Sequence, residues 1–338
     1  MTSHNMTWIR YPSKSQPFTY LEDIEAVIAA QNIISRFMHC YIAFFVPTGL
    51  IAGICILIVF IKNHLQNKRG SLDLLLLHFT ISNIIMIFLS FTVITRPDYL
   101  TATHLACSVL SFFFNFGYFN SQYAFILTLH TLLLERFPPV TALCKATQRP
   151  ILRAGFVLTY TFCLSLAEAV LVGTDSYQLE AHCQLDPLFA WPEYEIVKFT
   201  FGFGIPSLLQ LLCFTVLWAK KAPAGAPALQ QHIRTYLAVY VISVTMFICR
   251  LFYNIMVLFR TTLKLQRSIG TTKNELVMNI AEIVLFCESC ASLVVILFFH
   301  KPCKDEVLKC IQKCRRKTRA NNHLEIPEIA TPHRRGSQ

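Results

Sequence analysis

Long apolar runs separated by short polar connections dominate the chain. A membrane-spanning helix needs about 20 mostly apolar residues, each contributing a rise of about 1.5 Å. The pattern predicts such helices over residues 37–62, 71–95, 104–134, 150–173, 193–219, 230–259 and 274–299. The connections carry turn-forming and charged residues, as in Arg96-Pro97-Asp98. The hydrophobic pattern therefore predicts an all-α membrane protein, built as a seven-transmembrane helix bundle.

The segments outside the bundle have a different character. Residues 1–36 are predicted to be an extracellular N-terminal segment, and 37–299 the bundle. Over residues 300–316, apolar positions recur at helical spacing among lysines, which predicts a short amphipathic helix on the membrane surface. Residues 317–338 are polar and basic, and we expect a disordered cytoplasmic tail attracted to anionic membrane lipid.

Composition agrees with a membrane protein and changes how the net charge is interpreted. The chain is 54% hydrophobic and 14% charged, with a mean hydropathy of +0.49, whereas soluble domains are about 25% charged. The formal charge is +11. Its cations lie in short segments between apolar runs, so they indicate membrane topology rather than nucleic-acid binding. No signal-peptide pattern precedes the first run, which we expect to act as its own insertion signal.

Lys and Arg residues are divided unequally between the two sides of the predicted bundle. Twenty of the 30 fall on the side that carries the chain after residue 299, and nine fall on the other side. Because cytoplasmic loops retain cations, this asymmetry predicts a multi-pass plasma-membrane protein with its N-terminus outside the cell. Asn5-Met6-Thr7 is a glycosylation acceptor sequence, which is useful only on that outer side.

Two cysteines fall at predicted extracellular positions, where the oxidising environment permits a disulfide. Cys107 begins the third span, and Cys183 lies between the fourth and fifth. With seven spans, Pro206 in the fifth and a basic amphipathic segment after the seventh, this pair resembles the rhodopsin-like G-protein-coupled receptors, in particular divergent orphan or odorant-receptor-like members. The resemblance covers about residues 40–314. It implies an extracellular ligand bound among the helices, heterotrimeric G proteins and arrestin as partners, and no enzymatic activity.

The cytoplasmic end of the third span departs from the family pattern. Glu135-Arg136-Phe137 looks like the family's Asp-Arg-Tyr signature, but the family's spacing from Cys107 to the signature and on to a proline falls on His130-Thr131-Leu132. On that alignment, Glu135 and Arg136 lie about one turn further on, in the second cytoplasmic loop. On the alternative alignment, they are the signature itself. We expect His130, Thr131, Glu135 and Arg136 to face the G protein, and the displaced signature implies weak or constitutive coupling.

Ionisable residues inside spanning segments are costly, and by default they face the bundle interior and mark function. Four stand out: Glu168, Arg250, Glu282 and Glu288. Alignment with the family puts Arg250 at the floor of the ligand cavity and Glu288 near the same level. Because an unpaired guanidinium is not stable there, we predict that Arg250 pairs with Glu288 while Glu282 faces the cavity. The pair either contacts ligand or only fixes helix packing.

Aromatic residues crowd the third span, more than one helix face can hold. Most are expected to pack or to contact lipid, and a minority, including Phe114 and Tyr118, to line an apolar ligand pocket. The segment over residues 175–195 is acidic and that over 260–273 is basic. A pocket mouth with both signs does not select a ligand charge.

The remaining cysteines and histidines give two further predictions. Cys310 and Cys314, four residues apart beside the membrane, are candidates for palmitoylation. Most other cysteines lie in apolar runs, where a thiol behaves as a small hydrophobe, and the two histidines deep in the spans lack metal-ligand spacing. We therefore expect neither a metal nor a cofactor. The alternative function is a membrane transporter or channel that uses the buried charges Arg250, Glu282 and Glu288.

Overall fold

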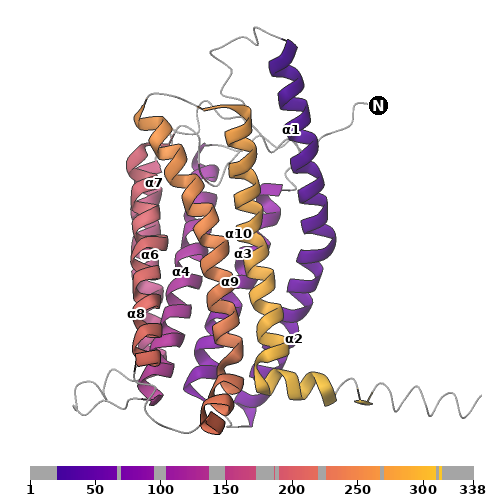
Figure 1. Ribbon diagram of the computed structural model, residues 1–338, viewed down its shortest axis with the longest axis vertical. Coiled ribbons are helices and arrows are strands. Elements are labelled where there is room, and N and C mark those ends of the chain that lie inside the picture. The colour runs from indigo at the N-terminus through magenta and orange to yellow at the C-terminus, as the bar shows by residue number, and fades with distance from the viewer. Residues whose placement is uncertain are drawn as a thin grey trace, which may run out of the picture.

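The computed structural model describes residues 21–66, 70–94, 104–136, 149–172, 186, 190–219, 226–266, 270–309 and 312–313. Over these residues the chain is an all-helical bundle (Figure 1). One continuous helix comprises α1 (Leu21–Cys40), the π-helical segment η1 (Tyr41–Phe45) and α2 (Val46–Leu65). A second comprises α7 (Pro192–Phe199), the π-helical segment η3 (Thr200–Gly204) and α8 (Ile205–Ala219). The others are α3 (Ser71–Ile94), α4 (His104–Arg136), α6 (Pro150–Val172), α9 (Ala226–Leu265) and α10 (Thr272–Phe299).

Six helical segments of the described chain are long and apolar enough to cross a membrane. They are Glu25–Asn63, Leu72–Phe91, Pro150–Val172, Pro192–Leu217, Leu237–Leu265 and Thr272–Phe299. The helix α4 has 33 residues but a more polar sequence. Asn115, Asn120, Ser121 and Gln122 interrupt its apolar run, and all four are buried against neighbouring helices. Each of the seven predicted spans overlaps a long helix of the described chain, whereas a membrane crossing by α4 stays a prediction.

The first helix begins earlier than predicted, at Leu21 rather than near residue 37. Ala30, Ile34, Met38 and Tyr41 recur every three to four residues and are all buried, so they form one apolar stripe that continues into the bundle. Polar residues on the opposite face lower the local hydropathy, so the uniformly apolar run begins later than the helix does.

Each π-helical segment ends two residues before a proline. The segment η1 precedes Pro47, and η3 precedes Pro206. A proline lacks the backbone N–H and its ring clashes with the carbonyl four residues earlier. A local change to the wider π-helical turn relieves this clash without ending the helix. The second segment also brings Gly202 against the Tyr118 ring of α4.

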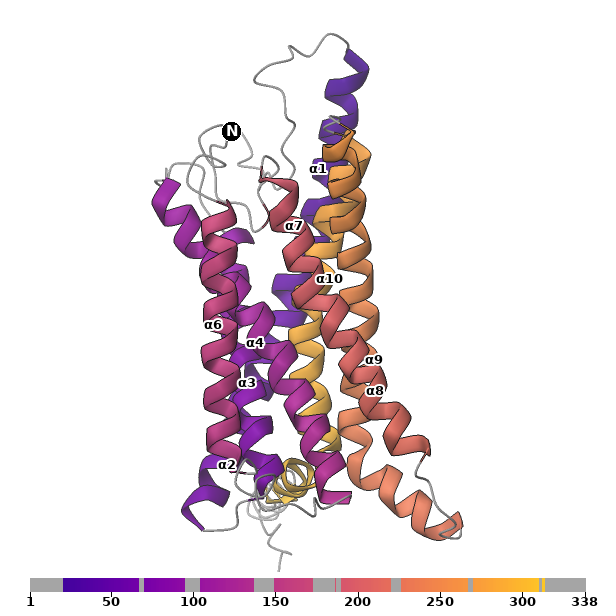
Figure 2. The ribbon, with the colours of Figure 1, turned by 90° about the vertical axis from the view of Figure 1, so that its left-hand side faces the viewer.

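The helices α10 and α4 occupy the middle of the bundle, whereas α6 lies at its periphery. In α10, 67% of the membrane-crossing window is buried, compared with 28% in α6. The helix α10 packs against α9, α2, α3 and α1, and α4 packs against α3, α6 and α8. Figure 2 shows the lower ends of α8 and α9 leaning away from those of α3 and α4.

A short helix over residues 301–309 lies across the lower end of the bundle (Figure 1). Glu306 accepts hydrogen bonds from Lys62 of α2 (2.7 Å) and from Lys309 (2.8 Å). The hydrogen bonds from Lys309 and Lys62 lower the pKa of Glu306 to about 2. His300 approaches Asp73 of α3 at 3.1 Å. These contacts fix the helix that the sequence predicts after residue 300.

Candidate functional site

Arg250 and Glu288 form the predicted interhelical ion pair. Arg250 Nε donates to Glu288 Oε2 at 3.0 Å, and both side chains are buried. The guanidinium also donates to the Tyr118 carbonyl at 3.1 Å and to Ser121 Oγ at 2.6 Å. A buried guanidinium is stable only when it is paired and hydrogen-bonded, and these contacts from α4 and α10 satisfy both conditions. The pair is confirmed, and no contact here tests its predicted ligand role.

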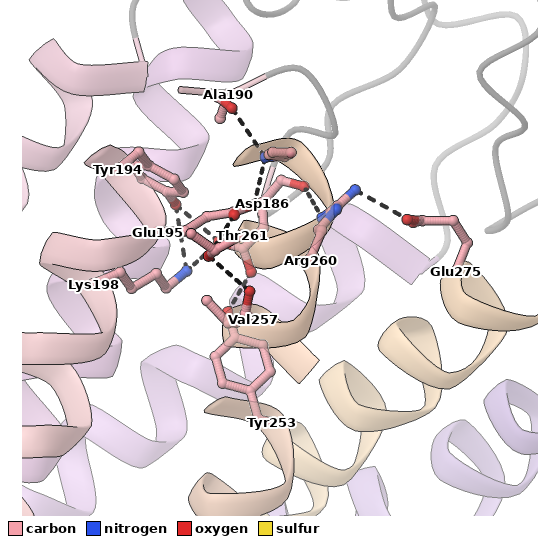
Figure 3. Close-up of polar contacts among 11 residues, drawn as sticks. Asp186, Ala190, Tyr194, Glu195, Lys198, Tyr253, Val257, Arg260, Thr261 and Glu275 are labelled. Carbon is pink, nitrogen blue, oxygen red and sulfur yellow. Dashed lines mark hydrogen bonds and ion pairs between the residues drawn. The ribbon is translucent and has the colours of Figure 1, made fainter. Parts of the chain in front are cut away.

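A second ion pair lies nearer the end of the bundle that carries the start of α7, and it involves a residue outside the helices (Figure 3). The Asp186 carboxylate accepts hydrogen bonds from Lys198 Nζ, from the Tyr194 hydroxyl at 2.9 Å and from the Tyr253 hydroxyl. Arg260 donates to the Asp186 carbonyl at 3.0 Å. Side chains of α7 and α9 therefore converge on Asp186, which precedes α7 in the sequence.

The pKa of the Asp186 carboxyl reflects this environment. Burial by itself would raise it, because desolvation disfavours the charged form. The Lys198 ammonium, together with hydrogen bonds from Lys198, Tyr253 and Tyr194, outweighs burial and holds the pKa below its ordinary value. Asp186 is therefore a stable carboxylate at neutral pH, despite being only 2% exposed.

Lys198 is fully buried and surrounded by aromatic rings. Its ammonium lies 4.9 Å from the centroid of the Phe114 ring and 5.5 to 5.6 Å from those of Tyr118, Tyr194 and Tyr253. The guanidinium of Arg250 lies 4.6 Å from the Tyr118 ring. Aromatic faces attract cations, so the Tyr118 ring lies against both cations and connects the Arg250–Glu288 pair with the Lys198–Asp186 pair. Phe114 and Tyr118, predicted to line a pocket, meet around a lysine that the prediction left out.

Two further ion pairs close the outer end of the cluster. Arg260 pairs with Glu275 at 3.3 Å, and Lys264 pairs with Glu195. Thr261 donates to Glu195 at 2.8 Å, and Lys264 donates to the Ala190 carbonyl at 3.0 Å. Lys264 of the basic segment is therefore neutralised by Glu195 of the acidic segment, whereas Arg260 pairs with Glu275 at the start of α10.

Glu168 and Glu282 are two further buried carboxyls among the residues predicted to mark function. Glu168 of α6 is fully buried, and neither of its oxygens has a hydrogen-bond partner among the described residues. It lies within electrostatic range of Lys198 and Asp186. Glu282, predicted to face the ligand cavity, is buried on α10 within electrostatic range of Tyr253 and Arg260.

The residues predicted to face a G protein lie at the lower end of α4. His130 is exposed, whereas Thr131 is buried and accepts a hydrogen bond from Arg153 at 3.4 Å. Glu135 and Arg136 are the last two residues of α4 rather than part of a loop, so that expectation was wrong. The helix continues to the second residue before Pro138-Pro139, because a proline disfavours helical geometry only at the residue directly before it. The side chains of Glu135 and Arg136 lie outside the described part.

Several predicted modification sites fall outside the described residues. Cys107 is disulfide-bonded, and its predicted partner, Cys183, is among the residues that the structure does not describe. The same holds for the glycosylation candidate Asn5 and the palmitoylation candidates Cys310 and Cys314. These four assignments stay predictions.

Lys198, Glu195, Asp186 and Arg260 were missed as site residues. The rule that singles out ionisable residues inside spanning segments applies to Glu195 and Lys198, since both lie in the predicted 193–219 span. They stand in its first two turns, where a charge is easily attributed to the membrane surface. Arg260 lies one residue past the predicted end of its span, and Asp186 carried no signal in the sequence.

Among the described residues, no group of His, Cys, Asp and Glu side chains has the arrangement of a metal site. The chemistry available at the cluster is therefore that of paired charges, hydroxyl donors and aromatic faces. This combination binds and orients charged groups away from water. No family model matches the sequence, and no curated protein matches it closely enough to indicate a relationship.

Proposed function

We propose that the chain is a seven-span cell-surface receptor, with its N-terminus outside the cell, that binds a small ligand among its helices and signals to heterotrimeric G proteins. In this proposal α4 also crosses the membrane and brings the number of spans to seven. Its polar residues are buried by the helices around it, so they do not oppose insertion as lipid-facing polar groups would.

One observation carries the proposal: the charged groups of the bundle interior gather in one half of it. They run from the outer pairs of Arg260 and Lys264 through Lys198 to Arg250 and Glu288. Below this level, the described buried residues include no Asp, Glu, Lys or Arg. Charges confined to one half of the interior favour ligand binding over passage of a charged solute across the membrane, because the ionisable groups that mark a transport pathway continue along it.

The opposite end has features that suit a cytoplasmic partner. The lower ends of α8 and α9 lean away from α4 (Figure 2), and His130 is exposed at the lower part of α4. Receptors of this kind signal by shifting helices between discrete packing arrangements. The polar contacts between α8 and α9, including that of Gln210 with the Ser243 carbonyl at 3.2 Å, would have to change in such a shift.

Arrestin recruitment is the assay of choice, because it does not depend on which G protein couples. Cells expressing the chain are screened with chemical and peptide libraries, and any active compound is repeated on Lys198→Met and Glu282→Gln. Glu306→Gln, at the solvent-facing surface, is the matched control. A ligand response lost in Lys198→Met and Glu282→Gln but kept in the control supports the proposal.

Topology is tested separately with epitope tags at both termini of the chain. Seven spans place the tags in different compartments, so only the N-terminal tag is labelled on intact cells. Labelling of both tags on intact cells, or of neither, would mean an even number of spans and would exclude the receptor proposed here.

A further inference from the structure

The donors around Asp186 belong to helices, whereas the acceptor does not. Lys198 and Tyr194 lie on α7, and Tyr253 and Arg260 lie on α9. All four are buried. The Asp186 carboxylate enters this set from the segment that precedes α7 (Figure 3). The bundle thus supplies a preformed carboxylate receptor, and a connecting segment supplies the carboxylate.

The Lys198 ammonium requires an anion at this position. It is fully buried, and Asp186 is its ion-pair partner among the described residues. The surrounding rings of Phe114 and Tyr118 attract the cation but do not neutralise it. Removing a partner from a buried charge is strongly destabilising, so the site is stable only when a carboxylate occupies it.

The donor geometry selects one position for that carboxylate. Glu168 is also buried and within electrostatic range of Lys198, yet it makes no hydrogen bond to any described residue. Tyr194 and Tyr253 direct their hydroxyls at the Asp186 oxygens instead. Three donors from two helices therefore converge on a single carboxylate, so the site fixes the position of that carboxylate as well as neutralising the Lys198 charge.

We propose that Lys198, Tyr194 and Tyr253 form a binding site for a small organic carboxylate, and that Asp186 is its resident, exchangeable occupant. A free carboxylate displaces Asp186 and pairs with Lys198, while an apolar or aromatic body on the ligand contacts Phe114 and Tyr118. No covalent step is involved. The site stands on the contacts above, whereas its control over signalling rests on the proposed receptor function.

Because Asp186 is part of the chain, a free carboxylate must bind strongly enough to compete with it. A group attached to the same chain competes with an effective concentration that depends on the length of its tether. A free carboxylate that makes only the contacts of Asp186 is therefore outcompeted at lower concentrations. Removing the Asp186 carboxylate abolishes this competition, so the empty site accepts a simple probe such as formate or acetate.

The test uses the full chain in lipid nanodiscs and compares thermal unfolding in sodium formate, sodium acetate and sodium chloride at equal ionic strength. Asp186→Ala is expected to lower the unfolding temperature, and formate or acetate to restore part of it saturably, whereas chloride does not. The same anions should leave the wild type unchanged. Asp186→Ala combined with Lys198→Met should lose the response, and Glu306→Ala, a surface carboxylate removal, should show none.

Two results would overturn the proposal: no saturable formate or acetate response in Asp186→Ala, or an equal response when Lys198 is also replaced. If Asp186→Ala unfolds during extraction, the recovery of folded protein with formate or chloride throughout purification becomes the measurement. Equal recovery in both salts then counts against the site.

Exchange in the wild type is measured with benzoate, whose ring can contact the aromatic side chains. Rising benzoate should increase hydrogen exchange in the peptide containing Asp186 and leave residues 301–309 unchanged. Unchanged exchange around Asp186 at saturating benzoate would contradict displacement. Basal arrestin recruitment by Asp186→Ala, with and without formate, separates the two proposals: thermal rescue without any change in recruitment keeps the site and contradicts the receptor function.

Discussion

The Arg250–Glu288 pair gives the sharpest test of how the bundle is stabilised. Three variants form a double-mutant cycle: Arg250→Met, Glu288→Met and the double replacement. Methionine is flexible and apolar, so it fills the space of either side chain without introducing a new hydrogen bond. We expect the double variant to be more stable than either single variant.

The magnitudes follow from what each replacement leaves behind. Glu288→Met leaves a buried guanidinium with only the neutral acceptors Tyr118 and Ser121. Arg250→Met leaves a fully buried carboxylate without its cation. Removing one partner of a buried pair costs about 3–5 kcal/mol. The double variant has no buried charge at this position and loses only the donor to Ser121 and the Tyr118 carbonyl, at a cost of about 1–3 kcal/mol.

The assay is thermal unfolding in nanodiscs, followed by intrinsic fluorescence, with surface expression as a second readout. The matched control is the solvent-facing pair of Lys62 and Glu306, whose single and double Met replacements should lower the unfolding temperature far less than those of the buried pair. The reasoning is refuted if the double variant is destabilised by the sum of the two single effects. That result would mean that each residue acts through other neighbours and that the ion pair has no net coupling.

Three further predictions concern the surroundings of this pair. Glu168→Leu should raise stability by about 1–3 kcal/mol, because it removes a buried carboxyl without hydrogen-bond partners among the described residues; a lower unfolding temperature would contradict this. Gly202→Ala should destabilise the protein, because a Cβ there overlaps the Tyr118 ring. The control Gly155→Ala, whose Cβ meets nothing within 4 Å, should be neutral or slightly stabilising. Equal unfolding temperatures for the two variants would show that the bundle relieves the overlap at Gly202 by a small shift. The stability advantage of the wild type over Asp186→Asn should be full above pH 4, because the folded-state pKa of Asp186 is depressed, and should be lost as the pH falls through that lowered pKa. A stability advantage of the wild type that grows as the pH falls would refute a lowered pKa for Asp186.

The sequence determined the positions of the helices, because each depends on local hydrogen bonds and on the length of an apolar run. The Arg250–Glu288 pair was also predicted, because a buried guanidinium requires a carboxylate partner and the resemblance to the receptor family put Glu288 near its level. The early start of α1 was readable as well, from the spacing of Ala30, Ile34 and Met38, although runs of uniform hydropathy do not reveal it.

The tertiary structure alone decided which polar groups meet at the Asp186 site. Asp186 and Tyr253 are far apart in sequence, and their contact depends on how α7 and α9 are rotated and on where Asp186 lies between them. No periodicity in the sequence marks Asp186 as a partner of these helices. The burial of Lys198 and of the polar face of α4 was likewise fixed by the packing of neighbouring helices. Local patterns specify which elements form, whereas the choice of partners among distant charges follows from the three-dimensional arrangement of those elements.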